Sequence, residues 1–520
     1  MSGRRWSSWL FGLALLVIAL GGCRARQEAP EPVTFRFGIA APLTSLDPVQ
    51  TVDALTLQLH LNTHSLLFRQ RSNGTLEPSL ALEARSNDRK TRWEITIRDN
   101  VWFPAPYGHA VTAEDVAATL LRAAEYEGSR VRWVFSRLAR DANGQPAIAA
   151  RDATTVVLEF QDPVDLPRYL ALPQLGILPK EVCSRAKFDF ANKSYGSGPF
   201  FVEAFDPERI VLRANDRGWP RPHVAVVELH VVRDAEVAFA MVASGRLDGV
   251  ELSLLQQLRM AKGERLPQGV RLITVPRSVH WEFLAFHTQL GPCSDKSLRR
   301  ALLFSLDRRD LCTGPLGGTC SPTNFVGPQL GTEFKEDPLY RPDLARSEWQ
   351  QAGQRPKKLE VLVVANERSV TMGRWLASQW QKTFKVDVAL VQLDPGPLFG
   401  RVMSQEPFEL ADFWVQPLAD LPEIWFLAWQ PGDFPPRGRN FTRYSNPAFA
   451  DLFALLRRES KIEVNSAIWQ RLEDLLEADP PAIPLFQRRA DFVVRDGFDW
   501  SVGPVLALEF FEVRPAGQRS

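Results

Sequence analysis

The stretch "WEITIRDNVWF" (93–103), followed closely by "VTAEDVAATLLR" (111–122), decides the fold class. In the first segment Ile95 and Ile97 alternate with polar neighbours, which is the two-residue period of a strand with one buried face. The second segment begins with Thr112, a favourable helix N-cap, and places acidic residues in the first turn, where the helix dipole stabilises them. A strand followed by an amphipathic helix predicts a mixed α/β protein.

The same alternation of strands and helices continues to the end of the chain. "KKLEVLVVA", "TMGRWLASQWQKTF" and "VDVALVQL" (357–393) predict a strand, a helix and a strand, a βαβ unit. "SDKSLRRALLFSLDRRDL" (294–311) predicts an amphipathic helix with Leu298, Ala301, Leu302 and Ser305 on one face. We interpret Asp307 and Arg308, within this segment, as a surface or inter-element ion pair. "NPAFADLFALLRRE" and "NSAIWQRLEDLLEADP" (446–480) predict two further helices, the second ending at Pro480.

The N-terminal residues predict export and a membrane anchor. A basic start, "MSGRR", precedes the apolar run "LFGLALLVIAL" (10–20), which is too short for a membrane span of about 20 residues but typical of a signal peptide. The run ends in "LGGC", which resembles a bacterial lipobox, so residues 1–22 would be removed and Cys23 would carry the lipid. An ordinary signal peptide with an incidental cysteine is the alternative. Residues 23–32 then form a polar tether.

Composition excludes several classes of function. The 520 residues carry 62 basic and 61 acidic side chains, without the basic run expected of a nucleic-acid-binding protein. No Gly-x-Ser-x-Gly, His-Glu-x-x-His or Walker-type motif occurs, so we expect no enzyme and no cofactor. Besides Cys23 there are four cysteines, of which Cys312 and Cys320 enclose a glycine-rich loop and are favoured as a disulfide; free buried thiols are the alternative.

An ordered series of motifs resembles the extracellular solute-binding protein family 5, the peptide, dipeptide and nickel receptors of ABC importers. Besides the two opening segments, the motifs are "SLDPVQTVDA" (45–54), "NGTLEPSLALEAR" (73–85), "YGSGPFFVEAF" (195–205), "SGRLDGVE" (244–251), "LRRALLFSLDRRDL" (298–311), "YSNPAFADL" (444–452) and "DPPAIPLF" (479–486). Each motif alone is weak evidence, but they occur in the family's order over almost the whole mature chain. Asp115, in "AEDV", we interpret as a helix cap.

The resemblance implies a bilobal periplasmic-binding-protein fold (type II, cluster C) with an extra inserted subdomain. Lobe I would comprise residues 33–51, 195–273 and 485–514, the inserted subdomain residues 52–194, and lobe II residues 274–484. A peptide-like solute would bind between the lobes and be enclosed by hinge closure. The resemblance further implies a monomeric receptor that works with ABC permease subunits on the periplasmic side of the bacterial cell envelope, anchored to a membrane through Cys23, with no nucleic acid as partner.

The ligand-binding residues that the resemblance implies depart from the family pattern at one position. Trp414 aligns with the family tryptophan, but Pro417 stands where peptide-binding relatives carry the aspartate that pairs with the peptide ammonium, and Asp420 matches a second family aspartate. Asp53, on the other lobe, could supply the missing charge or could be a solvated turn residue. The expected ligand-binding residues are Val52, Asp53, Ala54, Trp414, Val415, Gln416 and Asp420.

Two alternative functions and the role of two tryptophans remain to be considered. His60 and His64 are four residues apart and would share one helical face, a spacing that suits a metal, so a nickel or metal-chelate receptor is possible, although the sequence nominates no third ligand. A non-transport lipoprotein that uses the fold for envelope signalling is another. The tryptophans at 425 and 429, at helical spacing, are expected in the core rather than in a binding pocket.

Overall fold

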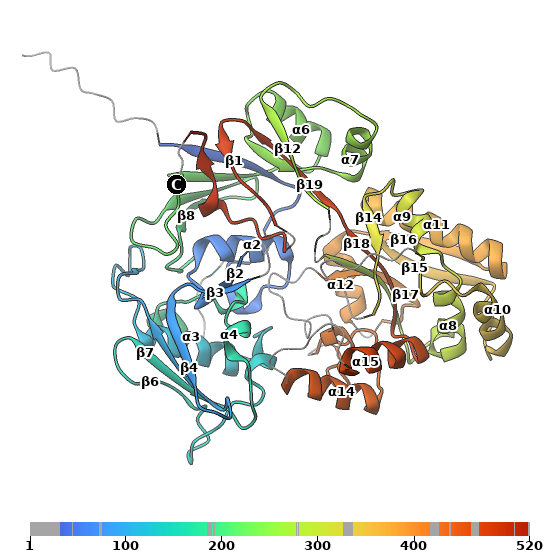
Figure 1. The fold of residues 1–520 in the computed structure, drawn as a ribbon, viewed down its shortest axis with the longest axis horizontal. Coiled ribbons are helices and arrows are strands. Elements are labelled where there is room, and N and C mark those ends of the chain that lie inside the picture. The colour runs from blue at the N-terminus through green and yellow to red at the C-terminus, as the bar shows by residue number, and fades with distance from the viewer. Residues whose placement is uncertain are drawn as a thin grey trace, which may run out of the picture. The chain divides into compact units, whose positions relative to one another are not determined.

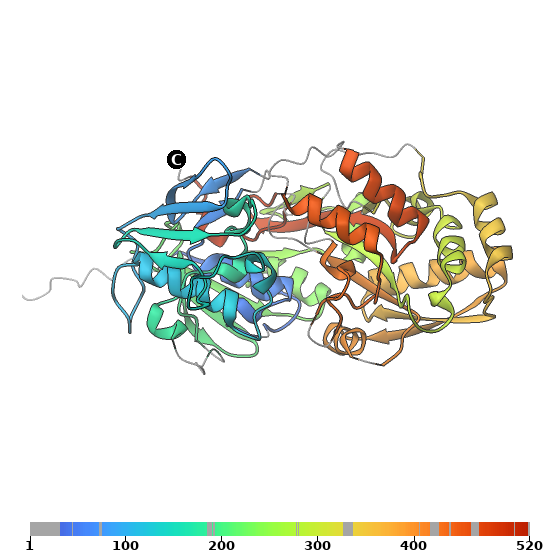
Figure 2. The ribbon, with the colours of Figure 1, turned by 90° about the horizontal axis from the view of Figure 1, so that it is seen from below.

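The computed structural model describes residues 32–517, except residues 44, 72–74, 185–189, 191–192, 277, 279, 326–335, 405, 416–425, 436–437, 459–466 and 504. Residues 34–520 form one compact unit. Most of its strands belong to three sheets, of seven, six and four strands, and helices pack between and around them (Figures 1 and 2). The predicted mixed α/β class is confirmed.

The seven-stranded sheet collects segments that are far apart in the sequence. Its order is β12-β19-β11-β1-β10-β9-β8, and β1 pairs in parallel with both β10 and β11. Helices α6 (Ala235–Ala243) and α7 (Leu254–Ala261) accompany it, and we call this assembly the first lobe. Its strands are β1 (Thr34–Ile39), β8 (Phe200–Phe205), β9 (Arg209–Ala214), β10 (Val226–Val231), β11 (Gly249–Glu251), β12 (Val270–Val275) and β19 (Ala490–Arg495).

The six-stranded sheet has the order β14-β18-β13-β17-β15-β16 and, with its helices, forms what we call the second lobe. Its strands are β13 (Trp281–Phe286), β14 (Cys320–Pro322), β15 (Lys358–Val364), β16 (Asp387–Leu393), β17 (Leu410–Val415) and β18 (Ala482–Arg488). The helices are α8 (Lys296–Phe304), α9 (Arg308–Thr313), α10 (Pro342–Gln351), α11 (Glu367–Phe384), α12 (Pro395–Met403), α14 (Pro447–Arg458) and α15 (Ala467–Ala478). The predicted βαβ unit is confirmed, since β15 and β16 are parallel and α11 connects them.

The four-stranded sheet, β4-β5-β7-β6, has a hydrophobic core of its own around helix α3 (Ala113–Glu125). Its strands are β4 (Ala81–Ser86), β5 (Arg92–Ile97), β6 (Ile148–Ala150) and β7 (Thr155–Glu159). The Thr112 hydroxyl accepts a hydrogen bond from the Asp115 N–H, and the Asp115 carboxylate accepts one from the Thr112 N–H. This reciprocal capping box confirms the predicted helix start and the capping role of Asp115.

The predicted helix over residues 294–311 is wrong in one respect. It is two helices, α8 and α9, because Asp307 accepts a hydrogen bond from the Arg309 N–H and caps the start of α9. The expected surface or inter-element ion pair between Asp307 and Arg308 is also wrong. Arg308 points into the core of the second lobe and pairs with Asp337 instead.

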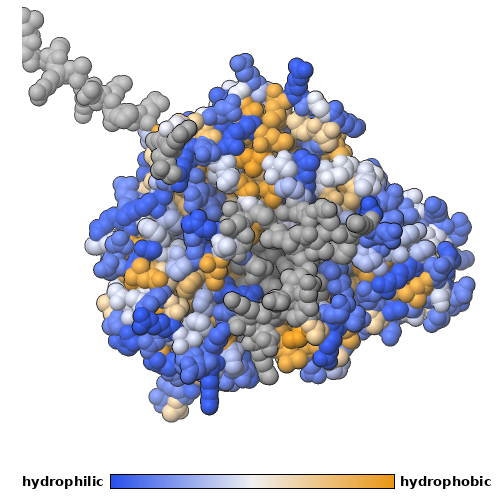
Figure 3. Space-filling view, viewed as in Figure 1, coloured by the Kyte–Doolittle hydropathy of each residue, from blue (hydrophilic) through white to orange (hydrophobic). Residues whose placement is uncertain are grey.

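Among the described residues, no helix combines the length and the apolar composition that a membrane crossing requires. The face seen in Figure 3 is mostly hydrophilic, with an apolar strip in the region of α6 and β12. Val237 of α6 and Leu272 of β12 are exposed apolar side chains of these elements. The expected domain boundaries stay a prediction.

Candidate functional site

The chain passes twice between the two lobes, and polar contacts gather around these crossings. One crossing joins β12 to β13, and the other joins β18 to β19 at Arg489. Beside the second crossing, Arg488 Nη2 of β18 lies 2.7 Å from Glu251 Oε1 of the first lobe. Arg368, at the start of α11, donates a hydrogen bond of 3.2 Å to Gln257 Oε1 of α7. The junction is therefore held by charged side chains as well as by the covalent chain.

Two buried carboxylates, Glu282 of β13 and Asp412 of β17, interact with each other at this junction. His280 Nε2 lies 2.9 Å from Glu282 Oε2, and Asp412 Oδ1 has no hydrogen-bond partner among the described residues. Burial raises the pKa of both carboxyls, and for Asp412 the neighbouring Glu282 raises it further. Because two neighbouring buried carboxylates are costly to charge together, the pair retains a proton to a higher pH than isolated carboxyls do.

Cations face this carboxylate pair from two sides. Arg368 and Arg488 both favour ionised Glu282, and burial lowers the pKa of Arg368 itself to about 10. Sequence reasoning missed this group. The signal available for it was an acidic residue in each of two otherwise apolar strands, "WEFLAF" and "LADFWV". A carboxylate on a buried strand is costly unless it is paired or protonated, and so it marks a site.

Two of the expected ligand-binding residues, Trp414 and Val415 of the second lobe, lie next to the Glu282–Asp412 pair. Trp414 is half-buried on β17, directly across from Glu282, and Val415 is across from Trp281. Residues 416, 417, 420 and 425, which include the expected Gln416 and Asp420, lie outside the described residues. Trp429 is fully buried, 5.6 Å from the ring of Trp281, which confirms that it belongs to the core.

The expected ligand-binding residues Val52, Asp53 and Ala54 lie at the start of helix α2 (Ala54–Thr63). Val52 is 50% exposed, and Ala54 is the first residue of the helix. The Asp53 carboxylate accepts a hydrogen bond of 2.8 Å from the Thr56 N–H and so caps α2. A cap does not occupy every lone pair of a carboxylate, and a ligand contact by Asp53 stays a prediction.

His60 of α2 and His64, the residue that caps the end of α2, are both buried, with their rings 5.2 Å apart and edge to face. Each has one nitrogen near a threonine hydroxyl, at 2.9 Å from Thr51 for His60 and at 3.0 Å from Thr63 for His64. Burial lowers the pKa of both, to about 4 for His64, so both rings are neutral at pH 7. The second nitrogen of each ring has no partner among the described residues.

A different group of potential metal ligands lies beside a cavity of about 550 Å³ at the start of α3. Ligand atoms of His109, Asp115 and Glu181 lie within 4.8 Å of one another. Asp115 is already engaged in the capping box and accepts the Lys180 N–H at 2.9 Å. A helix N-terminus also disfavours a cation, so we assign no metal to this group.

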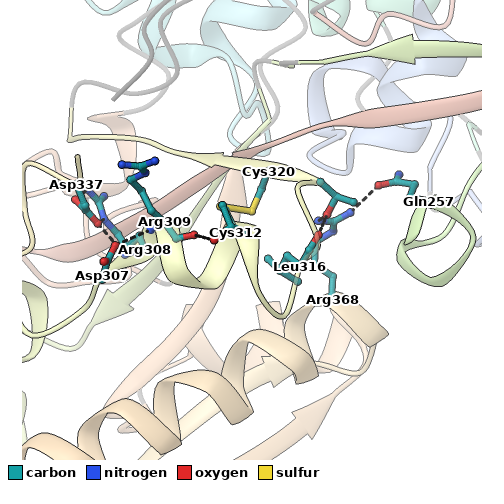
Figure 4. Close-up of a disulfide and its surroundings, with 11 residues drawn as sticks. Gln257, Asp307, Arg308, Arg309, Cys312, Leu316, Cys320, Asp337 and Arg368 are labelled. Atoms are coloured by element: carbon teal, nitrogen blue, oxygen red, sulfur yellow. Dashed lines mark hydrogen bonds and ion pairs between the residues drawn. A yellow bond between two sulfur atoms is a disulfide. The ribbon is translucent and has the colours of Figure 1, made fainter. Parts of the chain in front are cut away.

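Cys312 and Cys320 form a disulfide with a Cα–Cα distance of 5.2 Å (Figure 4). The two other cysteines in the described part of the chain, Cys183 and Cys293, are unpaired thiols. Burial raises the pKa of Cys183 to about 11, so its thiol is protonated and unreactive at neutral pH.

The architecture defines a class of protein. Two lobes built on separate sheets, joined by two crossings with charged and aromatic groups at the junction, are the arrangement of a two-lobed solute-binding protein. The comparison with known families gives the same result, because the model for "Bacterial extracellular solute-binding proteins, family 5 Middle" matches residues 75–447. The chain belongs to this family, and the predicted resemblance is confirmed. It is a solute-binding protein and not an enzyme.

Individual relatives are distant but cover most of the chain. The periplasmic murein peptide-binding protein MppA of Escherichia coli (strain K12) is 24% identical over 473 residues, 85% of each chain. The periplasmic binding protein DppA of Helicobacter pylori, solved with the peptide STSA, superimposes with a TM-score of 0.81 at 17% identity, covering 93% of this chain and 98% of that one. NikZ of Campylobacter jejuni, solved with Ni(L-His), gives 0.79 at 17%, covering 92% and 99%. The structural likenesses establish the fold.

Proposed function

We propose that the protein is a lipid-anchored substrate-binding receptor of an ABC importer, which binds a peptide-like solute between its two lobes by hinge closure. The family assignment over residues 75–447 is the observation that carries the importer role. Peptide-like solutes are favoured because MppA, the relative matched over 85% of its length, is named for murein peptide. Closure would bury the solute and create a shape that the permease distinguishes from the empty receptor.

The proposed binding residues come from two separate regions of the chain. Val52, Asp53 and Ala54 would contact the solute from the start of α2, and Trp414, Val415, Gln416 and Asp420 from the second lobe. The position of Trp414 across from buried Glu282 supports this assignment, because it places an aromatic surface beside the crossings about which the lobes would close. Aromatic side chains commonly line such sites and contact apolar parts of a ligand.

The first experiment is mass spectrometry of solute that copurifies with the native protein. A peptide or peptide derivative is expected, and it is then used in calorimetry with Trp414→Leu. Affinity should fall in this variant because Trp414 would contact the solute. Trp349→Leu on α10, whose ring stacks on Phe384 at 4.5 Å, is the matched control and should bind as the wild type does. Unchanged binding in Trp414→Leu would contradict the proposed site.

Two other functions give different results in the same assays. A nickel or metal-chelate receptor is the first alternative, because NikZ, of the same fold, was solved with Ni(L-His). Such a receptor would copurify with metal and bind Ni(L-His) more tightly than peptides. A non-transport signalling lipoprotein would be encoded apart from permease and ATPase genes, whereas an importer receptor is expected beside them.

A further inference from the structure

Helix α7 belongs to the first lobe by its place in the chain but packs on the second lobe. Leu254, its first residue, is part of a hydrophobic cluster whose other buried members are second-lobe residues between Trp281 and Phe486, and Leu258 packs against the same cluster. Leu252, just before the helix, belongs to a separate cluster with α6 and β19. One short helix therefore bridges the two lobes.

Polar groups at the start of α11, in the second lobe, form hydrogen bonds with α7. Arg368 donates a hydrogen bond of 3.2 Å to Gln257 Oε1 of α7 (Figure 4). It donates another, of 3.0 Å, to Thr319 Oγ1. Next to it, Glu367 Oε2 accepts a hydrogen bond of 3.1 Å from the Leu255 N–H. Because Gln257 is buried and Arg368 is partly buried, the two bonds of Arg368 are partly shielded from competing water, whereas the Leu255–Glu367 bond is exposed.

Thr319 lies in the short loop that the Cys312–Cys320 disulfide closes. Gly317 and Gly318 take φ angles of +55° and +80°, which side chains rarely adopt. A Cβ atom on Gly317 would lie 2.2 Å from Leu258 Cδ2, whereas one on Gly318 would meet nothing within 4 Å. The loop backbone therefore touches α7 at Gly317. Thr319 O also accepts a hydrogen bond of 2.8 Å from the Arg489 N–H, at the crossing between β18 and β19.

We propose that the loop closed by the Cys312–Cys320 disulfide is a latch that holds helix α7 of the first lobe on the second lobe. The disulfide restricts the loop to the shape in which Gly317 meets Leu258 and Thr319 accepts from Arg368. Without the disulfide the loop gains conformational freedom and Arg368 loses Thr319 as a hydrogen-bond acceptor. The surface of the second lobe on which α7 packs is then no longer fixed. This latch is a property of the fold and does not depend on which solute the protein binds.

Hydrogen–deuterium exchange of the full-length protein tests the latch without a solute. In Cys312→Ala/Cys320→Ala, amides of residues 254–261 should exchange roughly tenfold faster than in the wild type, as expected when a charge-assisted hydrogen bond that supports a local unit is lost. Amides of β13, in the core of the second lobe, should keep their protection. Dithiothreitol should act alike, since it delivers two electrons and two protons to the S–S bond and closes into its own cyclic disulfide.

Two glycine variants separate the latch from general loosening of the loop. Gly317→Ala should speed exchange in α7 with the disulfide intact, because its methyl group pushes against Leu258. Gly318→Ala also places a side chain at a positive φ but without that contact, and it should leave α7 exchange unchanged. Faster exchange confined to residues 312–320 in the cysteine variant, with α7 as protected as in the wild type, would overturn the proposal. So would equal effects of the two glycine variants on α7.

Discussion

Arg308 and Asp337 form an ion pair that is buried completely in the second lobe, between α9 and the segment before α10. Asp337 accepts hydrogen bonds of 2.8 Å from both the backbone N–H and Nε of Arg308, and the guanidinium also donates to the carbonyls of Thr323 and Pro484. Burial works against the charged form of Asp337, but Arg308 more than offsets it and lowers the pKa. These contacts bring together four chain segments, at residues 308, 323, 337 and 484. Figure 4 shows Arg308 beside Asp337.

Removing one partner of this pair should destabilise the protein strongly. In Asp337→Ala the Arg308 charge stays buried without its counter-charge, and such losses cost about 3–5 kcal/mol. Urea unfolding at neutral pH measures the difference. Asp343→Ala, which removes an exposed aspartate paired with Arg346 on α10, is the control and should change the free energy of unfolding by less than about 1 kcal/mol. Similar losses in both variants would contradict the importance of burial.

The Glu282–Asp412 pair should make the protein less stable as the pH rises. Both pKa values are raised in the folded state, so the folded protein keeps a proton that the unfolded chain releases above about pH 4. The contribution of this pair to the free energy of unfolding is therefore greatest at acidic pH. It is lost as the pH rises through the pKa that the pair has in the folded protein. The groups that face the pair are His280, Arg368 and Arg488, with the Ser369 hydroxyl close to Asp412.

Asp412→Asn tests this dependence, because an amide needs no proton to stay neutral beside Glu282. The melting temperature of the variant, relative to the wild type, should increase between about pH 5 and about pH 8. For the exposed control Asp343→Asn the difference should be constant over the same range. A relative melting temperature of Asp412→Asn that does not change with pH would show that the carboxyls do not share a proton.

Buried His64 should make the protein less stable in acid. Its pKa is lowered from 6.5 to about 4 on folding, so the unfolded chain binds the proton more readily and stability falls as the pH drops from 6.5 towards 4. Between about pH 7 and pH 5 the loss should be about 2 kcal/mol. His64→Gln should remove this part of the pH dependence of the free energy of unfolding, measured in urea. His230→Gln, on partly exposed β10, is the control and should retain more of that dependence. An unchanged slope in His64→Gln would refute the assignment.

Lipidation at Cys23 stays a prediction, because residues 1–31 lie outside the described part of the chain. Wild-type protein expressed in bacteria should incorporate a labelled fatty acid and remain with the membrane fraction, since acyl chains at one cysteine provide the apolar anchor. Cys23→Ser should lose the label and appear in the soluble periplasmic fraction. A variant that is still labelled would show that the lipobox interpretation is wrong.

The sequence predicted those features whose causes are local. Thr112 and Asp115 form a capping box within four residues, and the βαβ unit of β15, α11 and β16 follows from periodicity over one continuous segment. The partner of Arg308 could not be predicted in this way, because Asp337 lies 29 residues away and their contact depends on packing. The same holds for Glu282 and Asp412, which come together only when β13 and β17 pair in the six-stranded sheet.

The last prediction concerns the charge of the solute. Pro417 replaces the carboxylate expected from the family resemblance, and proline also has no N–H to donate. We therefore expect the protein to bind solutes that lack a free N-terminal ammonium at least as well as those that have one, unless Asp53 or Asp420 supplies the counter-charge. A missing charge-assisted hydrogen bond weakens a short peptide by roughly tenfold to a hundredfold.

Calorimetry with matched free and N-acetylated tripeptides tests this expectation on the wild type, Asp53→Asn and Asp420→Asn. Equal affinity for the two peptides in the wild type would support the interpretation of Pro417. A strong preference for the free amine that is lost in Asp420→Asn would show that Asp420 provides the charge. A preference lost only in Asp53→Asn would move ammonium recognition to the start of α2, where the same carboxylate caps the helix, and Asp53→Asn should keep most of that cap because asparagine is an equally good N-cap residue.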